Sequence, residues 1–496
     1  MIVPDKASAY RALQSRDARF DGQIFVGVKS TGIYCRPVCP ARTAKFENCT
    51  FYSSAAAAQE AGYRPCLRCR PETAPQLAAW QGTSSTVSRA LALIEEGALD
   101  GEAQTVETLA EKLGVGERQL RRLFLQHLGA SPIAVAQTRR VLFAKQLIHD
   151  TDLPMTEVAL ASGFSSLRRF NEVFQNLFKR PPTALRHSSA LRRRSSVVAT
   201  EAGTMLRLRY RPPYDWDAML HFLEARAIPG VEVVANRVYH RVIELDGELG
   251  AIAVKHLPKR ESLCVTIQFP SVKALPAIVH RVRRQFDLNV DIGTIDEHLS
   301  RDKQLAPLVA RRPGLRAPGG WDGFELAIRA VLGQQISVIA ARRLAGKLVE
   351  LHGRALPSGA GMHPDLTHAF PAAKHLAKTS SLGLGMPAAR LETLRSVTRA
   401  AAKSPEIFQS ASSMEQAIAS LKAIPGIGEW TAQYIALRAL REVDAFPASD
   451  IGLLRGAKKV TGDVLTAKQL HTRAERWRPW RAYAAQHLWA ADGDSK

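Results

Sequence analysis

The most informative stretch of the sequence is Leu421 to Ala457, LKAIPGIGEWTAQYIALRALREVDAFPASDIGLLRGA. Its pattern predicts a helix, a turn at Pro425-Gly426-Ile427-Gly428 and a second helix through Trp430, Tyr434 and Leu437. Glycine accepts the positive φ of a tight turn and, lacking a Cβ, lets another backbone come close. The free N–H groups at the start of the second helix then suit a phosphate. The stretch therefore predicts a phosphate-binding hairpin.

One carboxylate follows this hairpin at a short distance. Asp450 lies after Phe446-Pro447-Ala448-Ser449 and opens another apolar run. A helix-hairpin-helix that holds a DNA phosphate, followed by one aspartate, is the arrangement of base-excision glycosylases. The stretch resembles the helix-hairpin-helix glycosylase superfamily, and most of all the 3-methyladenine DNA glycosylase II (AlkA) family. The alternatives are an ordinary turn between two core helices and an aspartate that only caps the next helix.

The resemblance implies a role for several residues around this carboxylate. Asp450 is the expected catalytic group, and Ser449 beside it is a weaker candidate. Trp430, Tyr434 and Trp489 are expected to form an electron-rich pocket that stacks on a cationic base. Phe222 is expected at the edge of that pocket. Each ring is also compatible with an ordinary place in the core.

Two further sites follow from the same resemblance. Gly426 and Gly428 are expected to hold the DNA phosphate. Gln335 stands where the family places the side chain that wedges into the duplex when a base is flipped, and some members have an apolar residue there. Lyase-type relatives carry a lysine directly after the hairpin, where this chain has Trp430. We therefore expect base release without strand cleavage.

The chemistry asks little of the protein. An N-alkylated purine carries positive charge, so its glycosidic bond is already weak. The protein then needs only to stabilise an oxocarbenium-like sugar and to supply water. One buried carboxylate can stabilise that sugar.

The N-terminal segment has paired cysteines with metal-ligand spacing. Cys35 and Cys39 have three residues between them, and Cys66 and Cys69 have two. Such pairs converge on one tetrahedral Zn²⁺, which would also staple a segment too small to form much of a core. Disulfides and a purely structural zinc ribbon are the alternatives. The other cysteines of the six are expected to be ordinary thiols.

This segment resembles the zinc domain of the adaptive-response regulator (Ada) from Ser30-Thr31-Gly32 through Cys35-Arg36-Pro37 to Arg64-Pro65-Cys66. The resemblance implies that Cys35 accepts a methyl group irreversibly from a methylphosphotriester in DNA. Methylation removes one negative charge from a four-thiolate site, which should strengthen DNA binding. Phosphate contacts are expected from five arginines of this segment: Arg36, Arg42, Arg64, Arg68 and Arg70.

Two similar helix-turn-helix units follow. Each has a helix, a glycine-bearing turn and a basic helix with apolar residues at helical spacing. The pair resembles an AraC-type double helix-turn-helix, including the closing Lys179-Arg180-Pro181-Pro182-Thr183. The residues expected to reach the major groove are Arg118, Gln119, Arg121 and Arg122 in the first unit, and Arg168, Arg169 and Asn171 in the second. A helical bundle with solvated arginines is the alternative.

The composition fits a DNA-binding protein of several domains. The chain has 496 residues, a formal net charge of +22 and 46% hydrophobic residues. The charge favours a polyanionic partner, and the length exceeds a single core. No apolar stretch is long enough to span a bilayer, and the start lacks a signal-peptide core. We expect a monomer in the cytoplasm, associated with the nucleoid and with no membrane partner.

We expect a multidomain, mainly α protein with α+β parts. The predicted domains are a small zinc methyl-acceptor domain at 1–78, a double helix-turn-helix domain at 85–186, a basic linker at 187–203, a small α+β sheet domain at 204–310 and an all-α helix-hairpin-helix glycosylase domain at 311–496.

The functional hypothesis combines excision and regulation. The chain is expected to excise 3-methyladenine- and 7-methylguanine-type bases from double-stranded DNA and to activate transcription at promoter DNA with RNA polymerase as partner. Zn²⁺ is the only expected cofactor. The main alternative is a regulator whose glycosylase half is inactive and only senses damage. Another alternative is a glycosylase whose N-terminal half merely anchors it to DNA. The chain lacks the Pro-Cys-His-Arg motif of an alkylguanine transferase, so repair of alkylguanine is not expected.

Overall fold

A computed structural model describes residues 5–74, 85–100, 104–186, 203–357, 361–408 and 413–493. The chain divides into two compact units. The first comprises Met1–Arg209 with Ser271–His280, and the second Tyr210–Pro270 with Arg281–Lys496. The basic linker predicted at 187–203 falls almost entirely outside the described residues. None of the described helices is both long and apolar enough to cross a membrane.

The first unit begins with a four-stranded sheet in the order β3-β1-β2-β4. Its elements are α1 (Lys6–Gln14), β1 (Phe25–Val28), β2 (Ile33–Cys35), β3 (Cys49–Tyr52), α2 (Ala55–Glu60) and β4 (Arg64–Pro65). β2 and β4 pair in parallel, with Tyr34 opposite Pro65. Because the chain leaves both strands at the same edge, Cys35 and Cys66 come out side by side.

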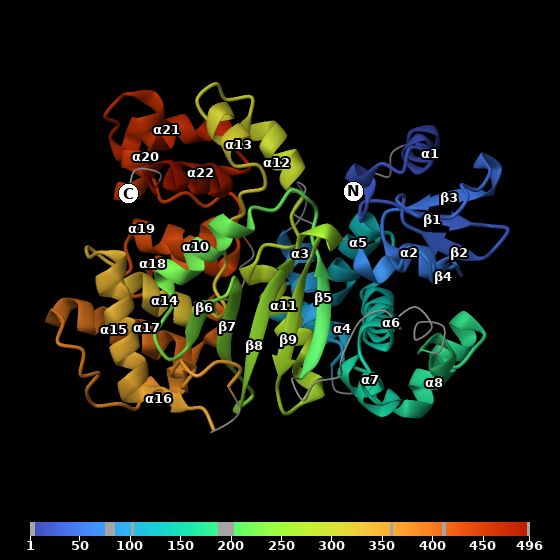
Figure 1. The fold of residues 1–496 in the computed structure, drawn as a ribbon, viewed down its shortest axis with the longest axis horizontal. Coiled ribbons are helices and arrows are strands. Elements are labelled where there is room, and N and C mark those ends of the chain that lie inside the picture. The colour runs from blue at the N-terminus through green and yellow to red at the C-terminus, as the bar shows by residue number, and fades with distance from the viewer. Residues whose placement is uncertain are drawn as a thin grey trace. The chain divides into compact units, whose positions relative to one another are not determined.

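The helices of the regulator part follow. They are α3 (Ser85–Glu95), α4 (Val106–Lys112), α5 (Glu117–Leu128), α6 (Pro132–Asp150), α7 (Met155–Ala161) and α8 (Leu167–Phe178), and β5 (Thr204–Arg209) follows them. Figure 1 shows α6 between the first helix-turn-helix pair, α4 and α5, and the second, α7 and α8. In α8, Phe170, Phe174 and Phe178 recur every four residues, and neighbouring ring centroids lie 4.8 and 5.3 Å apart. This buried stripe leaves the polar face of α8 exposed.

The second unit contains an antiparallel meander, which follows α10 (Trp216–Arg226). Its strands β6 (Glu232–Ala235), β7 (Val238–Leu245), β8 (Glu248–Leu257) and β9 (Ser262–Gln268) lie side by side in Figure 1. Buried Arg241 on β7 pairs with Glu232 and with Glu325 of α14 (Gly323–Leu332). Arg329, also on α14, pairs with both carboxylates. These charges balance each other in the core and attach the sheet to the helical part.

The remainder of the second unit is mainly helical. Besides α14, its α-helices and short strands are α10 (Trp216–Arg226), α12 (Ile292–Leu299), α13 (Ala306–Arg311), α15 (Val338–His352), β10 (Arg354–Ala355), β11 (His368–Ala369), α16 (Ala373–Leu376), α17 (Ala388–Lys403), α18 (Met414–Lys422), α19 (Glu429–Ile435), α20 (Ile451–Thr461), α21 (Ala467–Ala474) and α22 (Arg481–Gly493). The helix α11 (Leu275–Gln285) begins in the residues of the first unit and ends in those of the second. A π-helical turn, Ala436–Leu440, extends α19. The expected class, mainly helical with small sheets, is confirmed.

Candidate active site and zinc site

The carboxylate of Asp450 accepts three N–H groups. Asp450 is the N-cap of α20, and its Oδ1 accepts the backbone N–H of Leu453 at 3.0 Å. The indole N–H of Trp489 donates to the same oxygen at 2.8 Å, and that of Trp430 donates to Oδ2 at 2.8 Å. Donors on both oxygens complement an anion and fix its orientation, while the side chain stays half-buried.

Two glycines let α20 and α22 approach each other closely. A Cβ on Gly452 would lie 3.1 Å from Cδ1 of Trp489, and one on Gly456 would lie 2.8 Å from the backbone carbonyl carbon of Leu488. These glycines are four residues apart and face α22. Larger residues there would push Trp489 away from Asp450.

The predicted pocket rings gather around this carboxylate. Trp430 and Tyr434 stack with centroids 5.4 Å apart and planes at 15°, and Tyr434 meets Trp489 edge-on at 6.4 Å. The guanidinium carbon of Arg438 lies 4.6 Å from the ring centroid of Phe222, 5.0 Å from that of Trp489 and 5.8 Å from that of Tyr434. All four predicted rings thus belong to one cluster. Arg438 was not predicted, although it continues the spacing of Trp430 and Tyr434 by four residues.

Arg438 is 2% exposed. Its Nη1 donates to the carbonyl of Pro318 and its Nη2 to Oε1 of Gln486, each at 2.9 Å. Among the described residues no carboxylate forms an ion pair with it. Burial lowers the pKa of Arg438 to about 10, so the guanidinium remains charged at neutral pH.

The glycine hairpin has two different glycines. Gly426 has φ +87°, and a Cβ there would lie 2.7 Å from both Cβ and Cγ2 of Thr393. Gly428 is the N-cap of α19 with φ −86°, and a Cβ there would meet nothing within 4 Å. Gly426 therefore serves the turn, while Gly428 leaves open space in front of the helix N-terminus.

The loop before α15 is tied to this hairpin. Gln334 donates to Oγ1 of Thr431 at 3.0 Å. Gln335, the predicted wedge, is exposed and holds a left-handed φ of +57°. A non-glycine residue in that conformation indicates a backbone held by its surroundings.

The four predicted zinc ligands come together. The Sγ atoms of Cys35, Cys39, Cys66 and Cys69 all lie within 4.8 Å of one another. Zn–S bonds of about 2.3 Å in a tetrahedron require sulfur atoms about 3.8 Å apart, so this set fits Zn²⁺ after a small contraction. Three of the cysteines are buried, and Cys35 is the partly exposed one.

The sulfur atoms differ in their hydrogen bonds. The backbone N–H of Arg68 donates to Cys66 at 3.3 Å and that of Arg36 to Cys69 at 3.5 Å. Hydrogen bonds with Cys35 and with the backbone of Ala41 contribute to lowering the pKa of Cys39 to about 7. Within the described ranges no backbone N–H donates to Cys35.

The arginines near the zinc site correct one expectation. Arg36 is 4% exposed and pairs with Asp21, and Arg70 pairs with Glu72 and Asp150. Burial against Asp21 removes Arg36 from the expected phosphate contact, whereas the Arg70 side chain is 25% exposed and its phosphate contact stays a prediction. Sequence alone cannot distinguish a buried arginine such as Arg36 from an exposed one such as Arg68 when both lie next to a zinc-binding cysteine.

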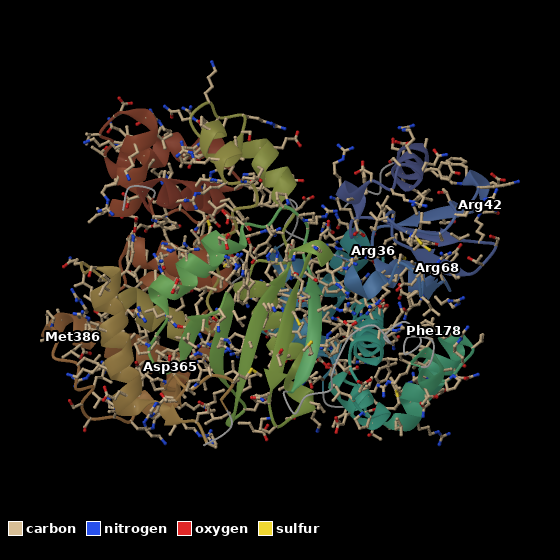
Figure 2. All side chains as sticks on the ribbon, in the orientation of Figure 1. Arg36, Arg42, Arg68, Phe178, Asp365 and Met386 are labelled. Carbon is tan, nitrogen blue, oxygen red and sulfur yellow. The ribbon has the colours of Figure 1, made fainter. Side chains whose placement is uncertain are left out.

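Two of the other arginines lie at the surface. Arg42 and Arg68 are exposed on the zinc part and are labelled in Figure 2. Arg64 is partly exposed. These three remain available to DNA.

A buried lysine behind the zinc site was missed. Lys145 of α6 donates to the carbonyl of Cys66 at 2.8 Å and to Oε2 of Glu72 at 2.6 Å. Its side chain is fully buried, although its position in α6 gives no sign of a charged partner. This contact attaches the zinc part to the regulator helices.

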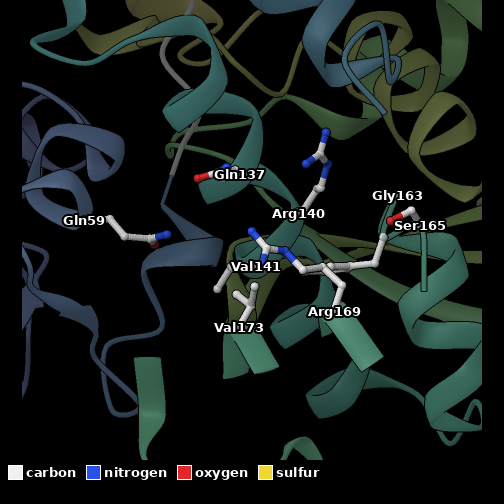
Figure 3. A pocket seen from close by; sticks show the side chains of 9 residues that line it. Gln59, Gln137, Arg140, Val141, Gly163, Ser165, Arg169 and Val173 are labelled. Carbon is white, nitrogen blue, oxygen red and sulfur yellow. The ribbon is translucent and has the colours of Figure 1, made fainter. Parts of the chain in front are cut away.

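The predicted DNA-reading residues lie on the outer faces of α5 and α8. Arg118, Gln119, Arg121, Arg122, Arg168, Arg169 and Asn171 are all exposed. Within the first compact unit, a cavity of about 220 Å³ adjoins the second helix-turn-helix. It is lined by Gln59, Gln137, Arg140, Val141, Gly163, Phe164, Ser165, Arg169 and Val173 (Figure 3). Arg140 in its wall is paired with Asp100. Arg169 therefore borders a hollow as well as solvent.

Comparison with known proteins matches three segments to family models. Residues 8–72 match the metal binding domain of Ada, 109–188 a helix-turn-helix domain, and 205–322 the AlkA N-terminal domain. A solved structure, the 3-methyladenine DNA glycosylase of Archaeoglobus fulgidus, is similar in fold with a TM-score of 0.51 and 23% identity, over 58% of this chain and 98% of that one.

Curated relatives match the two halves. The chain is 35% identical to DNA-3-methyladenine glycosylase 2 of Escherichia coli K12, over 58% of this chain and 98% of the relative. It is 34% identical to the bifunctional transcriptional activator/DNA repair enzyme Ada of the same organism, over 31% of this chain and 42% of the relative.

Fold and sites together define a DNA glycosylase joined to a zinc- and helix-turn-helix-containing regulator. One relative spans both halves: a probable bifunctional transcriptional activator/DNA repair enzyme AlkA of Mycobacterium tuberculosis is 40% identical over 98% of this chain and 96% of its own. The chain belongs to this family of bifunctional Ada/AlkA proteins.

Proposed function

We propose that this chain hydrolyses the N-glycosidic bond of alkylated bases in double-stranded DNA and separately senses methylphosphotriesters by methyl transfer to Cys35. The observation that carries the first activity is the Asp450 carboxylate, fixed by the indole N–H groups of Trp430 and Trp489 within a cluster of aromatic rings. Substrates of the 3-methyladenine and 7-methylguanine type fit a pocket of electron-rich rings.

The proposed excision needs charge stabilisation more than acid catalysis. The flipped base stacks on rings of the cluster, and its departure takes the electron pair of the C1′–N bond. Positive charge then develops on the sugar, where the Asp450 carboxylate stabilises it. The oxygen of water forms the new bond to C1′ and releases a proton. Gly428 leaves room for the DNA phosphate that holds this geometry.

The matched variant for this proposal is Asp450→Asn. Asparagine caps a helix as well as aspartate, so the N-cap of α20 is retained while the charge is lost. Release of 3-methyladenine and 7-methylguanine from methylated DNA is expected to fall by at least about 100-fold, as for other groups that stabilise transition-state charge. Equal release by both proteins would leave Asp450 with a capping role only.

The methyl acceptor is proposed from the differences among the four sulfur atoms. Zinc, when bound, keeps cysteines as thiolates at neutral pH. Cys35 is the most exposed of the four, and no described residue gives it a backbone N–H donor of the kind that reduces the charge on the other sulfurs. Its sulfur attacks the methyl carbon, the S–CH₃ bond forms, and the O–CH₃ bond breaks with its electron pair on the phosphate oxygen.

Mass spectrometry tests this second activity. After incubation with methylphosphotriester DNA, one added methyl group is expected on Cys35 and none on Cys39, Cys66 or Cys69. A methyl on another cysteine would contradict the assignment.

The remaining assignments rest on the same proposal. We propose the domain limits expected from the sequence, which are 1–78, 85–186, 187–203, 204–310 and 311–496. The exposed residues of α5 and α8 are proposed to read promoter DNA, so that a monomer associated with the nucleoid recruits RNA polymerase. Footprinting at the chain's own promoter, with Arg121→Ala and Arg168→Ala as variants, tests the DNA-reading part.

A further inference from the structure

The rings of the proposed base pocket share one buried cation. The Arg438 guanidinium carbon lies 4.6 to 5.8 Å from the ring centroids of Phe222, Trp489 and Tyr434. Its hydrogen-bond acceptors, the Pro318 carbonyl and the Gln486 amide, are neutral. A base that stacks on these rings therefore lies in the field of a positive charge that forms no ion pair with any described residue.

We infer that Arg438 is a specificity-determining residue that allows this site to release neutral modified bases as well as cationic ones. This inference rests on the proposed glycosylase function and deepens it. During cleavage the base takes the electron pair of the C1′–N bond, so its charge falls by one in either case. A cationic base leaves neutral, whereas a neutral base leaves as an anion until water supplies a proton.

The field of Arg438 acts differently on the two substrate classes. For a neutral base it has no charge to act on in the ground state and stabilises the anion in the transition state, which raises kcat/KM. For a cationic base it opposes binding and acts on no net charge in the transition state. It therefore raises kcat and KM together and leaves kcat/KM unchanged.

The size of the effect follows from Coulomb's law. A base stacked against the rings lies about 8 Å from the guanidinium, and at an effective dielectric constant of about 20 the interaction corresponds to about a 30-fold change in rate. The indole-bound Asp450 carboxylate lies beside the sugar, where it stabilises the opposite charge. The two groups together polarise the bond that breaks.

The test compares two bases of similar shape in one preparation. Single-turnover release of hypoxanthine, which is neutral, and of 7-methylguanine, which is cationic, is measured with wild type and Arg438→Met. We expect kcat/KM for hypoxanthine to fall about 30-fold and that for 7-methylguanine to change by less than about threefold, while its kcat and KM both fall. The ratio of the two substrates does not depend on the fraction of folded protein.

Two further variants separate charge from packing. Arg438→Lys keeps the cation and is expected to retain most hypoxanthine release. Gln486→Glu keeps the shape of the amide, places a carboxylate where the guanidinium now donates, and is expected to reproduce the loss of Arg438→Met. These variants keep the test valid if Arg438→Met does not fold.

The outcomes distinguish the role of Arg438 from the proposed glycosylase function. An equal fall for both bases in Arg438→Met and Gln486→Glu would make Arg438 a structural residue. Release of 7-methylguanine without any hypoxanthine from the wild type would overturn this inference and leave the proposed function intact. Release of neither base would overturn the proposed function itself.

Discussion

The two hairpin glycines give a prediction in which stability and DNA binding separate. Gly426→Ala places a Cβ within 2.7 Å of three atoms of Thr393, Oγ1, Cβ and Cγ2, and imposes φ +87° on a residue with a side chain. The left-handed conformation costs about 1–2 kcal/mol, and overpacking costs about 1–3 kcal/mol more. Less freedom in the unfolded chain returns about 0.5 kcal/mol. We expect the free energy of unfolding of the glycosylase part to fall by about 2–4 kcal/mol.

Gly428→Ala is the matched variant. Its φ of −86° suits alanine and no atom lies within 4 Å of the new Cβ, so stability should change by less than about 1 kcal/mol. The same Cβ enters the space in front of the α19 N-terminus. We expect the DNA concentration for half-maximal single-turnover release to rise about tenfold. The slope of log affinity against log salt concentration should become shallower by about one, which corresponds to the loss of one phosphate contact.

The measurements are denaturant unfolding and single-turnover release of 7-methylguanine at several salt concentrations. Release reports on the glycosylase site alone, so DNA bound by the helix-turn-helix units does not obscure it. Unchanged DNA dependence in Gly428→Ala would refute the phosphate role of the hairpin. Undiminished stability in Gly426→Ala would refute the steric argument, and Gly426→Ala with Thr393→Gly should recover part of the loss.

Three other perturbations have defined outcomes. Trp489→Phe removes the N–H donor to Asp450, and release of 7-methylguanine should slow about 10- to 100-fold, the value of a hydrogen bond to a charged group; an unchanged kcat would contradict the role of that bond. Burial lowers the pKa of His149 to about 4, so below pH 6.5 the unfolded chain binds a proton that the native one does not. Stability should therefore drop by about 2 kcal/mol between pH 7 and 4.5, and His149→Gln, followed by thermal melting, should lack this part of the drop. Lys145→Met leaves buried Glu72 with one cation fewer and should lower the free energy of unfolding of the zinc part by about 3 kcal/mol, measured by denaturant unfolding. Adding Glu72→Gln should recover part of the loss. Undiminished stability of Lys145→Met would contradict the role of this ion pair.

Local spacing predicted the features that depend on neighbouring residues. The cysteine pairs, the glycine hairpin and the two helix-turn-helix units are short patterns, and the structure places them as expected. Even the position of Arg438 was implicit, because residues 430, 434 and 438 share one helix face. Its burial was not, since that depends on α10 and α22 packing against the same face.

Charged residues were the least predictable from sequence. Arg36 lies directly after Cys35 and Arg68 directly before Cys69, yet Arg36 is buried against Asp21 and Arg68 is exposed. Lys145 meets Glu72 from 73 residues away. Whether a charge is solvated or paired depends on such distant partners, and one sequence contains no signal for them.

The most direct test of the account uses one DNA substrate that carries both methylphosphotriesters and alkylated bases. Wild type, Asp450→Asn and Cys35→Ser are incubated with it, and released base and protein-bound methyl are measured together. The account predicts that Asp450→Asn loses base release and keeps methyl transfer, whereas Cys35→Ser keeps release and accepts no methyl. A wild-type protein that releases no base while binding the DNA would contradict it and leave a regulator with an idle glycosylase half.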